Sequence, residues 1–162
     1  MTDRQITGLA RALGRACLRR GVSVATAESC TGGGVAEAIT RISGSSGWFE
    51  RGFVTYTNPA KKEMLGVSQR SLARYGAVSE EVAREMATGA LKHSSAGVSV
   101  AITGIAGPTG GSRLKPVGTV HFAWAVRGAA VQARRFRFAG NRAQVRLQSM
   151  YVALQGLIDL LR

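Results

Sequence analysis

The stretch that decides the fold is residues 22–42, VSVATAESCTGGGVAEAITRI. Its first part, Val22–Ala27, is a short apolar run that predicts a buried strand. A glycine-rich turn follows at Ser29–Gly34, and apolar residues from Val35 to Ile42 then recur at helical spacing. We therefore expect a strand, a tight turn and a helix. Small residues and backbone N–H groups would gather at the helix start, an arrangement that suits an anion or an oxyanion.

Working outward, the same two elements alternate along most of the chain. A helix is expected at residues 3–20, ended by Gly21, and three more begin at the capping residues Asn58, Ser79 and Asn141. Further strands are expected at Gly52–Thr57, Val98–Thr103, Thr119–Val126 and Val131–Phe138. This alternation predicts one α/β domain over residues 1–162, with three α/β/α layers and a mixed sheet.

Length and composition fit that prediction. The chain has 162 residues with 45% hydrophobic content, enough for one core and too little for two ordinary domains. Only two cysteines occur, Cys17 and Cys30, so nothing indicates a disulfide framework and a reducing compartment fits. The N-terminus lacks the apolar stretch of a signal peptide, and no apolar run is long enough to span a membrane. We expect a cytoplasmic protein.

The net charge of +13 points to a polyanion partner or an anionic substrate, although a general bias toward arginine would produce it equally well. Basic residues cluster at Arg11–Arg20 and at Arg134–Arg137. Neither cluster has interleaved aromatic residues, so neither resembles a platform on which bases stack.

Several common chemistries are excluded by the residues present. The only histidines, His93 and His121, lie near a helix end and inside an apolar strand, where structural roles are typical. The only aspartates, Asp3 and Asp159, lie near the two ends of the chain, which makes a Ser-His-Asp triad improbable. No cluster has metal-ligand spacing, and the glycine-rich turn has neither the Walker A ending nor the dinucleotide-binding spacing.

Hydroxyl groups and lysines remain as candidates, gathered at predicted strand ends, turns and helix starts. A serine nucleophile needs a base, and a lysine serves when burial or neighbouring cations lower its pKa. Lys61 follows the strand that bears Tyr56, so these two side chains can approach each other. For any one of these residues alone, a plain surface or capping role remains the simpler interpretation.

Four motifs in order resemble the CinA C-terminal domain family over nearly the whole chain. The first is Thr26-Ala-Glu-Ser-Cys-Thr-Gly-Gly33, and the second is Gly44-Ser-Ser-Gly-Trp-Phe-Glu-Arg-Gly-Phe-Val-Thr-Tyr56, followed by Lys61 and Leu65-Gly-Val67. The third is Tyr75-Gly-Ala-Val-Ser79. The fourth is Ile102-Thr-Gly-Ile-Ala-Gly-Pro108 with Gly110-Gly111 and Lys115-Pro-Val-Gly-Thr119.

The resemblance implies hydrolysis of nicotinamide mononucleotide to nicotinate mononucleotide and ammonia, a step of pyridine nucleotide recycling. It also implies a Ser–Lys mechanism, for which we assign Ser46 as nucleophile, Lys61 as base and Tyr56 as their neighbour. Ser29 is the competing nucleophile, or else a ligand of the substrate or oxyanion. The expected substrate-binding residues are Thr31, Gly32, Gly33, Thr103, Gly104 and Arg142, the last as a phosphate ligand by charge and position. No metal or organic cofactor is needed, and a homo-oligomer is expected.

Two alternatives stay open at this level. One is a basic nucleic-acid-binding or competence-associated accessory protein, which the charge favours. The absence of interleaved aromatics and of a helix-turn-helix pattern opposes it. The other is a catalytically silent, oligomer-forming member of the same family, against which the intact Ser46, Tyr56 and Lys61 argue.

Overall fold

In the computed structural model, which describes all 162 residues, five strands form one mixed sheet in the order β2-β1-β3-β4-β5. Their bounds are β1 Val24–Glu28, β2 Phe49–Val54, β3 Val98–Gly104, β4 Thr119–Val126 and β5 Gln132–Arg137. Strand β1 pairs in parallel with β2 and with β3, whereas β4 pairs antiparallel with β3 and with β5. The carboxyl ends of β2, β1 and β3 therefore meet at one edge of the sheet.

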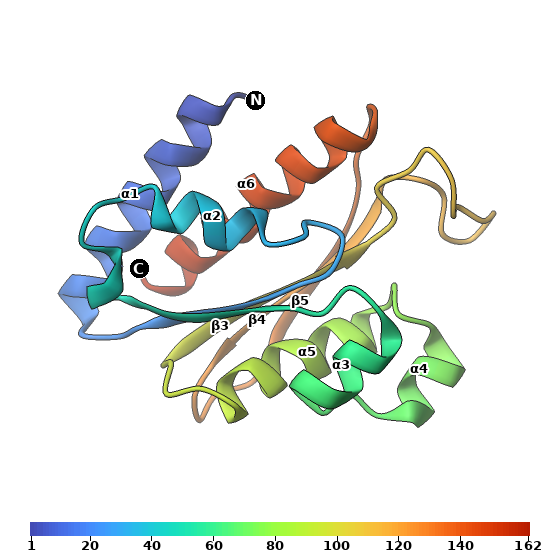
Figure 1. The fold of residues 1–162 in the computed structure, drawn as a ribbon, viewed down its shortest axis with the longest axis horizontal. Helices are drawn as coiled ribbons and strands as arrows, with labels where there is room; N and C mark the ends of the chain where they lie inside the picture. Colours follow the sequence, from blue (N-terminus) through green and yellow to red (C-terminus); the bar gives the residue numbers. More distant parts are fainter.

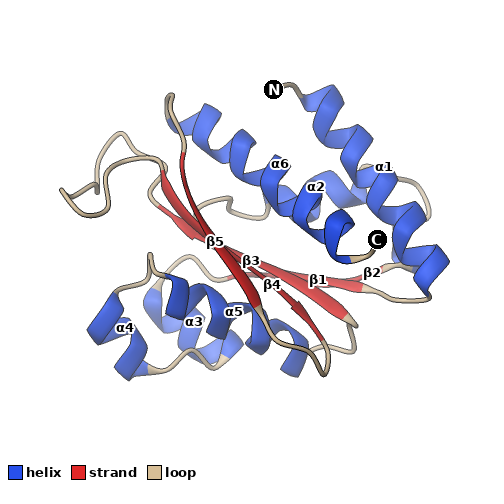
Figure 2. Ribbon diagram, turned by 180° about the vertical axis from the view of Figure 1, so that it is seen from behind, coloured by secondary structure: helices blue, strands red, loops and turns tan.

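Helices cover both faces of this sheet, which makes three layers (Figures 1 and 2). One face carries α1, α2 and α6, and the other carries α3, α4 and α5. Their bounds are α1 Asp3–Arg20, α2 Gly34–Thr40, α3 Asn58–Leu65, α4 Gln69–Tyr75, α5 Glu80–Lys92 and α6 Arg142–Leu160, with a short 3-10 turn at Ser45–Gly47. None of the helices is long and apolar enough to cross a lipid bilayer.

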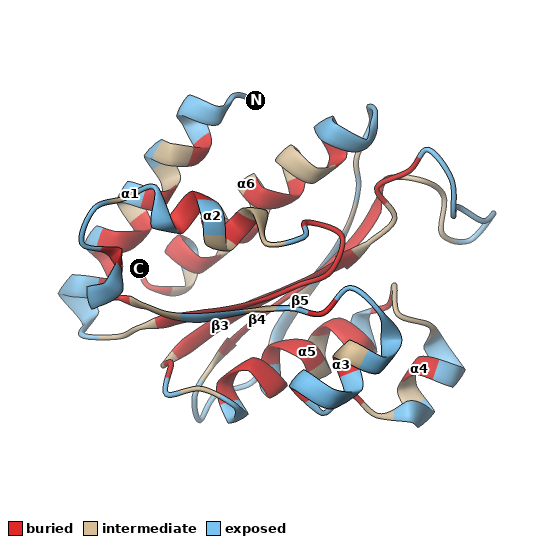
Figure 3. Cartoon of the chain, in the orientation of Figure 1, coloured by how far each residue is buried: buried red, intermediate tan, exposed pale blue.

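Each face of the sheet has its own hydrophobic core, visible as the buried inner surfaces in Figure 3. On the α1/α6 side the core holds large side chains, among them Phe122, Trp124 and Leu154. On the α5 side it consists mainly of alanines, including Ala25 and Ala101 on the central strands. Small residues there let α5 pack closely on the strands, so the sheet is a rigid base for the segments at its edge.

The glycine-rich turn after β1 is held by a buried carboxylate. The two Glu28 oxygens accept hydrogen bonds from the backbone N–H groups of Val35 at 2.8 Å and Ala36 at 3.0 Å. These N–H groups belong to the first turn of α2, whose N-cap Gly33 has no side chain to satisfy them. Gly32 and Gly33 have φ of 58° and 95°, backbone conformations that favour glycine. The turn can therefore fold back tightly over the end of β1.

The expected α/β fold with a mixed sheet between two helical layers is confirmed, as are the caps Gly21, Ser79 and Asn141. Three local predictions differ. Helix α4 was not expected, because its seven residues bury only Leu72 and so show no periodicity. Strand β2 begins and ends three residues before the predicted Gly52–Thr57, since an edge strand with mixed exposure lacks a clear apolar pattern.

The third difference concerns the start of α3. Its N-cap is Thr57 and not Asn58, and the Thr57 side chain accepts a hydrogen bond from the N–H of Ala60. The shift by one residue moves Pro59 to the second helical position, where its missing N–H is still harmless.

The two hydrogen bonds from the Val35 and Ala36 N–H groups to Glu28, which we call the Glu28 clamp, can be tested by their effect on stability. We expect Glu28→Gln to lower the free energy of unfolding by about 1–3 kcal/mol, because a glutamine has one acceptor oxygen for the two N–H groups of Val35 and Ala36. Urea unfolding followed by circular dichroism measures it. The control is Glu37→Gln, which removes an exposed i,i+4 pair with Arg41 and should cost no more than about 1 kcal/mol. Equal unfolding midpoints for the two variants would contradict the clamp.

Candidate active site

Three parallel strands deliver polar residues to the same place. Ser29 follows β1 directly, Thr55 follows β2 directly, and Thr103 is the penultimate residue of β3. The pairing continues beyond the strand ends, because Ser29 N–H donates to the Ile102 carbonyl at 2.9 Å and Thr55 N–H donates to the Glu28 carbonyl at 2.8 Å. These bonds hold Ser29 and Thr55 in register beside each other. In α/β sheets, ligands bind outside the carboxyl ends of the strands.

The amino group of Lys61 reaches Ser29 and Thr55 from α3, in the helical layer that also contains α4 and α5. Lys61 lies on the second turn of α3, and its residue surface is only 1% exposed. Its Nζ lies 2.9 Å from Ser29 Oγ, 2.8 Å from the Thr55 carbonyl oxygen and 3.4 Å from the Tyr56 carbonyl oxygen. All three neighbours are oxygens of neutral groups, so no carboxylate compensates a buried ammonium here.

Burial lowers the pKa of Lys61 from its ordinary 10.5 to about 8, because the charged form loses its hydration. Near pH 7 about a tenth of the amine is therefore neutral. A neutral amine has two N–H groups and one lone pair. The Thr55 and Tyr56 carbonyls can accept both N–H groups, which leaves the lone pair directed at the Ser29 hydroxyl. The geometry thus provides Ser29 with a base.

The neighbouring thiol is a poor competitor for this role. Cys30 is buried beside Ser29, and burial raises the pKa of its thiol to about 12. A thiol with such a pKa stays protonated at neutral pH and is inert as a nucleophile. Of the two adjacent side chains, the Ser29 hydroxyl is the one in hydrogen-bond contact with the Lys61 amine.

Ser29 and Lys61 line a cavity of about 190 Å³. Its other walls come from the ends of the three parallel strands and the residues after them, from the first residue of α3, from the segment between α4 and α5, and from the start of α6. The residues are Cys30, Tyr56, Asn58, Ala77, Val78, Thr103, Gly104, Ala106 and Arg142. The Thr103 hydroxyl donates to the Ala77 carbonyl at 2.8 Å, which fixes the apolar side of the cavity. Within the mouth, Arg142 donates to the Tyr56 hydroxyl and to the Gly107 carbonyl, each at 2.9 Å.

Two backbone N–H groups beside Ser29 have no protein acceptor. The amides of Cys30 and Thr31 take part in none of the hydrogen bonds of the turn, whereas those of Gly32 and Gly34 donate to the carbonyls of Ser29 and Thr31. Free donors immediately after a nucleophile are the usual components of an oxyanion hole.

The structure brings together six of the residues expected from the sequence: Ser29, Tyr56, Lys61, Thr103, Gly104 and Arg142. It does not bring Thr31, Gly32 and Gly33 to the cavity wall. Gly32 and Gly33 face a separate depression bounded by Arg146 and Met150 on α6. The Thr31 hydroxyl is buried without a partner, and its carbonyl accepts a hydrogen bond from Arg146.

The expected pairing of Ser46 with Lys61 requires a correction. Ser46 is exposed in the 3-10 turn that precedes β2, while Thr55 and Lys61 follow that strand. The six residues of β2 separate the two ends by about 20 Å, given the rise of ~3.3 Å per residue in a strand. Ser46 therefore cannot reach Lys61 in this fold, and Ser29 occupies the position next to the amine.

Two residues that shape the site, Thr55 and Glu28, could not be identified from residue types in the sequence. Thr55 acts through its backbone carbonyl, which leaves no signal in the sequence. Glu28 acts through the turn that it clamps. An acidic residue at the end of an apolar strand was the one available signal, because buried carboxylates are rare unless they are hydrogen-bonded.

Fold and site together define a class of protein. It is a three-layer α/β domain with a buried serine–lysine pair at the ends of parallel strands. The comparisons with known proteins then give the family: the CinA C-terminal domain model matches residues 6–161, and the chain belongs to that family.

Relatives and solved structures agree with this assignment. The nicotinamide-nucleotide amidohydrolase PncC of Escherichia coli is 55% identical over 97% of this chain and 95% of its own length. The protein of the same name from Pseudomonas putida is 52% identical over 96% of both chains. The crystal structure of the competence/damage inducible protein CihA from Agrobacterium tumefaciens has a TM-score of 0.95 at 48% identity, covering 98% of this chain and 96% of the other.

Proposed function

We propose that this chain is a nicotinamide-nucleotide amidohydrolase that converts nicotinamide mononucleotide to nicotinate mononucleotide and ammonia, with Ser29 as nucleophile and Lys61 as base. The observation that carries the proposal is the 2.9 Å contact between the buried Lys61 Nζ and Ser29 Oγ. It supports an amide-cleaving role in a chain that is 55% identical to a PncC protein over nearly its whole length.

The first half of the reaction forms an ester. Neutral Lys61 takes the proton of the Ser29 hydroxyl while Ser29 Oγ attacks the carboxamide carbon. The resulting ammonium of Lys61 then protonates the departing nitrogen, the C–N bond breaks, and ammonia leaves. The acyl group remains on Ser29. Because the pyridine ring of the substrate already carries a positive charge, it withdraws electrons and makes the carboxamide easier to attack.

The second half returns the enzyme to its starting state. Lys61, neutral again after protonating the departing nitrogen, takes a proton from water, and the hydroxide attacks the ester carbon. The ester bond breaks, Ser29 Oγ regains its proton from Lys61, and nicotinate mononucleotide is released. In both halves the negative oxygen faces the free amide of Cys30, which lines the cavity, and one such donor is worth roughly 3–4 kcal/mol in related chemistry.

The size of the cavity supports recognition of the nicotinamide ring of the substrate and not of the whole nucleotide. At about 190 Å³ it is smaller than the roughly 300–1,000 Å³ of sites that enclose drug-sized ligands. The pyridine ring would enter between Ala77, Val78 and Ala106, while the ribose phosphate stays at the mouth. Arg142 lies there, and its guanidinium suits a phosphate. We place the enzyme in the cytoplasm, which its two free cysteines support.

The choice of nucleophile is tested by three variants. We expect Ser29→Ala and Lys61→Ala each to lower kcat by several orders of magnitude, and the double variant to lose little more than either single one, because residues that act as a unit are not additive. Ser46→Ala is the control and should keep nearly the full rate. Ammonia release from nicotinamide mononucleotide is the measurement. An inactive Ser46→Ala beside an active Ser29→Ala would refute the assignment.

The pH dependence follows from the lowered pKa of Lys61. Because the free enzyme must hold the amine neutral, kcat/KM should rise about tenfold per pH unit below pH 8 and level off above it. A steady-state series from about pH 6 to pH 9.5 measures this. A profile that is flat, or that falls with rising pH, would exclude Lys61 as the base.

The role of Arg142 is tested with a substrate that lacks the phosphate. We expect Arg142→Ala to raise KM for nicotinamide mononucleotide by about 10- to 100-fold with kcat nearly intact, since a lost ionic contact removes uniform binding. With nicotinamide riboside, wild type and variant should differ little. An equal loss on both substrates would show that Arg142 shapes the site instead of binding phosphate.

A further inference from the structure

Helix α1 carries four arginines on one outward face. Arg4, Arg11, Arg15 and Arg19 follow one another at intervals of seven, four and four residues, which places them on the same side of an α-helix. All four are exposed, and the outer side of α1 is free of other elements (Figure 3). We call these four residues the α1 arginine row. At 1.5 Å per residue it is about 22 Å long.

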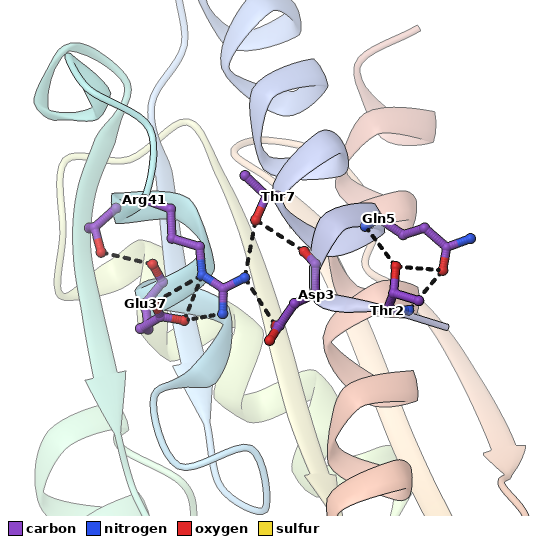
Figure 4. Close-up of polar contacts among 7 residues, drawn as sticks. Thr2, Asp3, Gln5, Thr7, Glu37 and Arg41 are labelled. Carbon is purple, nitrogen blue, oxygen red and sulfur yellow. Dashed lines mark hydrogen bonds and ion pairs between the residues drawn. The ribbon is translucent and has the colours of Figure 1, made fainter.

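None of the four makes an ion pair or a side-chain hydrogen bond within the chain. The acidic residues around α1 are engaged elsewhere: Asp3 and Glu37 both bind Arg41, which ties α1 to α2 (Figure 4). Asp159 pairs with Arg162 near the end of α6. The next arginine, Arg20, is also occupied, because it donates to the carbonyls of Leu161 and Arg162. The row is therefore an uncompensated line of positive charge.

We propose that the α1 arginine row binds the sugar–phosphate backbone of a DNA duplex, independently of base sequence and apart from the active site. Guanidinium groups bind phosphate oxygens in a bidentate manner, and a straight row of them matches a line of phosphates. The exposed positions between the arginines hold Gln5, Gly8 and Leu18. Gly8 and Leu18 offer no hydrogen bonds to base edges, and the Gln5 side chain is engaged in the cap of α1, where its Oε1 accepts from the Thr2 N–H at 2.8 Å. Contacts to phosphate alone position a protein on DNA without reading its sequence.

The same face is poorly suited to an anionic membrane. Amphipathic helices bind bilayers by burying an apolar face in the interface. The apolar face of α1, with Ile6, Leu13 and Cys17, is already buried in the core against α6 and α2. Leu18 alone would be left to insert. A nucleic acid needs no insertion, so the exposed charge favours it.

The row is separate from the catalytic cavity, none of whose lining residues comes from α1. The paired test compares two double variants that lose the same charge. Arg11→Gln/Arg15→Gln removes the centre of the row, and Arg134→Gln/Arg137→Gln removes two exposed, unpaired arginines of β5, an edge strand of the sheet. Each protein is titrated with a short DNA duplex of mixed sequence at about 50 and about 200 mM salt, by fluorescence anisotropy. Nicotinamide mononucleotide hydrolysis reports that each variant is folded.

With four phosphate contacts, the duplex affinity of wild type should fall by about 150-fold between the two salt concentrations. The duplex affinity of the α1 variant should fall by only about 12-fold between the same two salt concentrations, and at low salt it should be about a hundredfold weaker than that of wild type. The β5 variant should behave as wild type. All three should hydrolyse substrate at the same rate, so loss of hydrolysis in every protein would bear on the proposed function alone.

Three results would overturn the inference. One is that the two double variants weaken binding equally, which would make overall charge the cause. The second is that wild type does not bind the duplex at low salt. The third is that wild type binds vesicles of phosphatidylcholine and phosphatidylserine in equal parts more tightly than it binds the duplex, which would identify a membrane surface as the ligand.

Discussion

The active site depends on one buried carboxylate at the end of β1. Glu28 binds the first amides of α2 and so folds the glycine-rich turn back over the strand. The residue after it, Ser29, is fixed on its other side by the backbone bond to Ile102. The backbone of Ser29 is therefore fixed on both sides, which restricts where its hydroxyl can lie. Reacting groups must be held within a fraction of an ångström for efficient catalysis. The glycines of this segment serve the same purpose, because they adopt the turn's positive φ values without steric strain.

Burial of Lys61 makes its amine a base, and it also requires hydrogen-bond acceptors for the amine inside the protein. A lysine in the interior loses the hydration of its charged form, so a structure that buries Lys61 favours the neutral amine. A neutral amine is a base, whereas an exposed one at neutral pH is only a cation. The surrounding carbonyls of Thr55 and Tyr56 satisfy its N–H groups, which avoids an unpaired polar group in the core. The arrangement makes histidine unnecessary in a chain that has only two.

Charge is distributed unevenly between the site and the surface. The cavity has one arginine at its mouth, Arg142, which hydrogen-bonds to neutral oxygens and forms no ion pair, while much of the positive charge lies on outer faces such as α1 and β5. An anionic substrate is drawn toward a positive molecule, and that effect does not need each charge to touch it. The net charge of +13 is thus compatible with a small phosphate-bearing substrate and with a second, larger polyanion on a different face.

The sequence by itself determined the class of fold, most helix and strand positions, and the set of polar residues from which the site is built. Helical spacing, capping residues and apolar strand runs act locally, so they are visible in one dimension. Which serine faces Lys61 was decided only by the tertiary structure. Ser29 and Ser46 both lie in small-residue turns beside β1 or β2, but parallel pairing places the carboxyl ends of these strands together and leaves Ser46 at the other end. The roles of the Thr55 carbonyl and the Glu28 carboxylate likewise arise from pairing between segments, which no local pattern records.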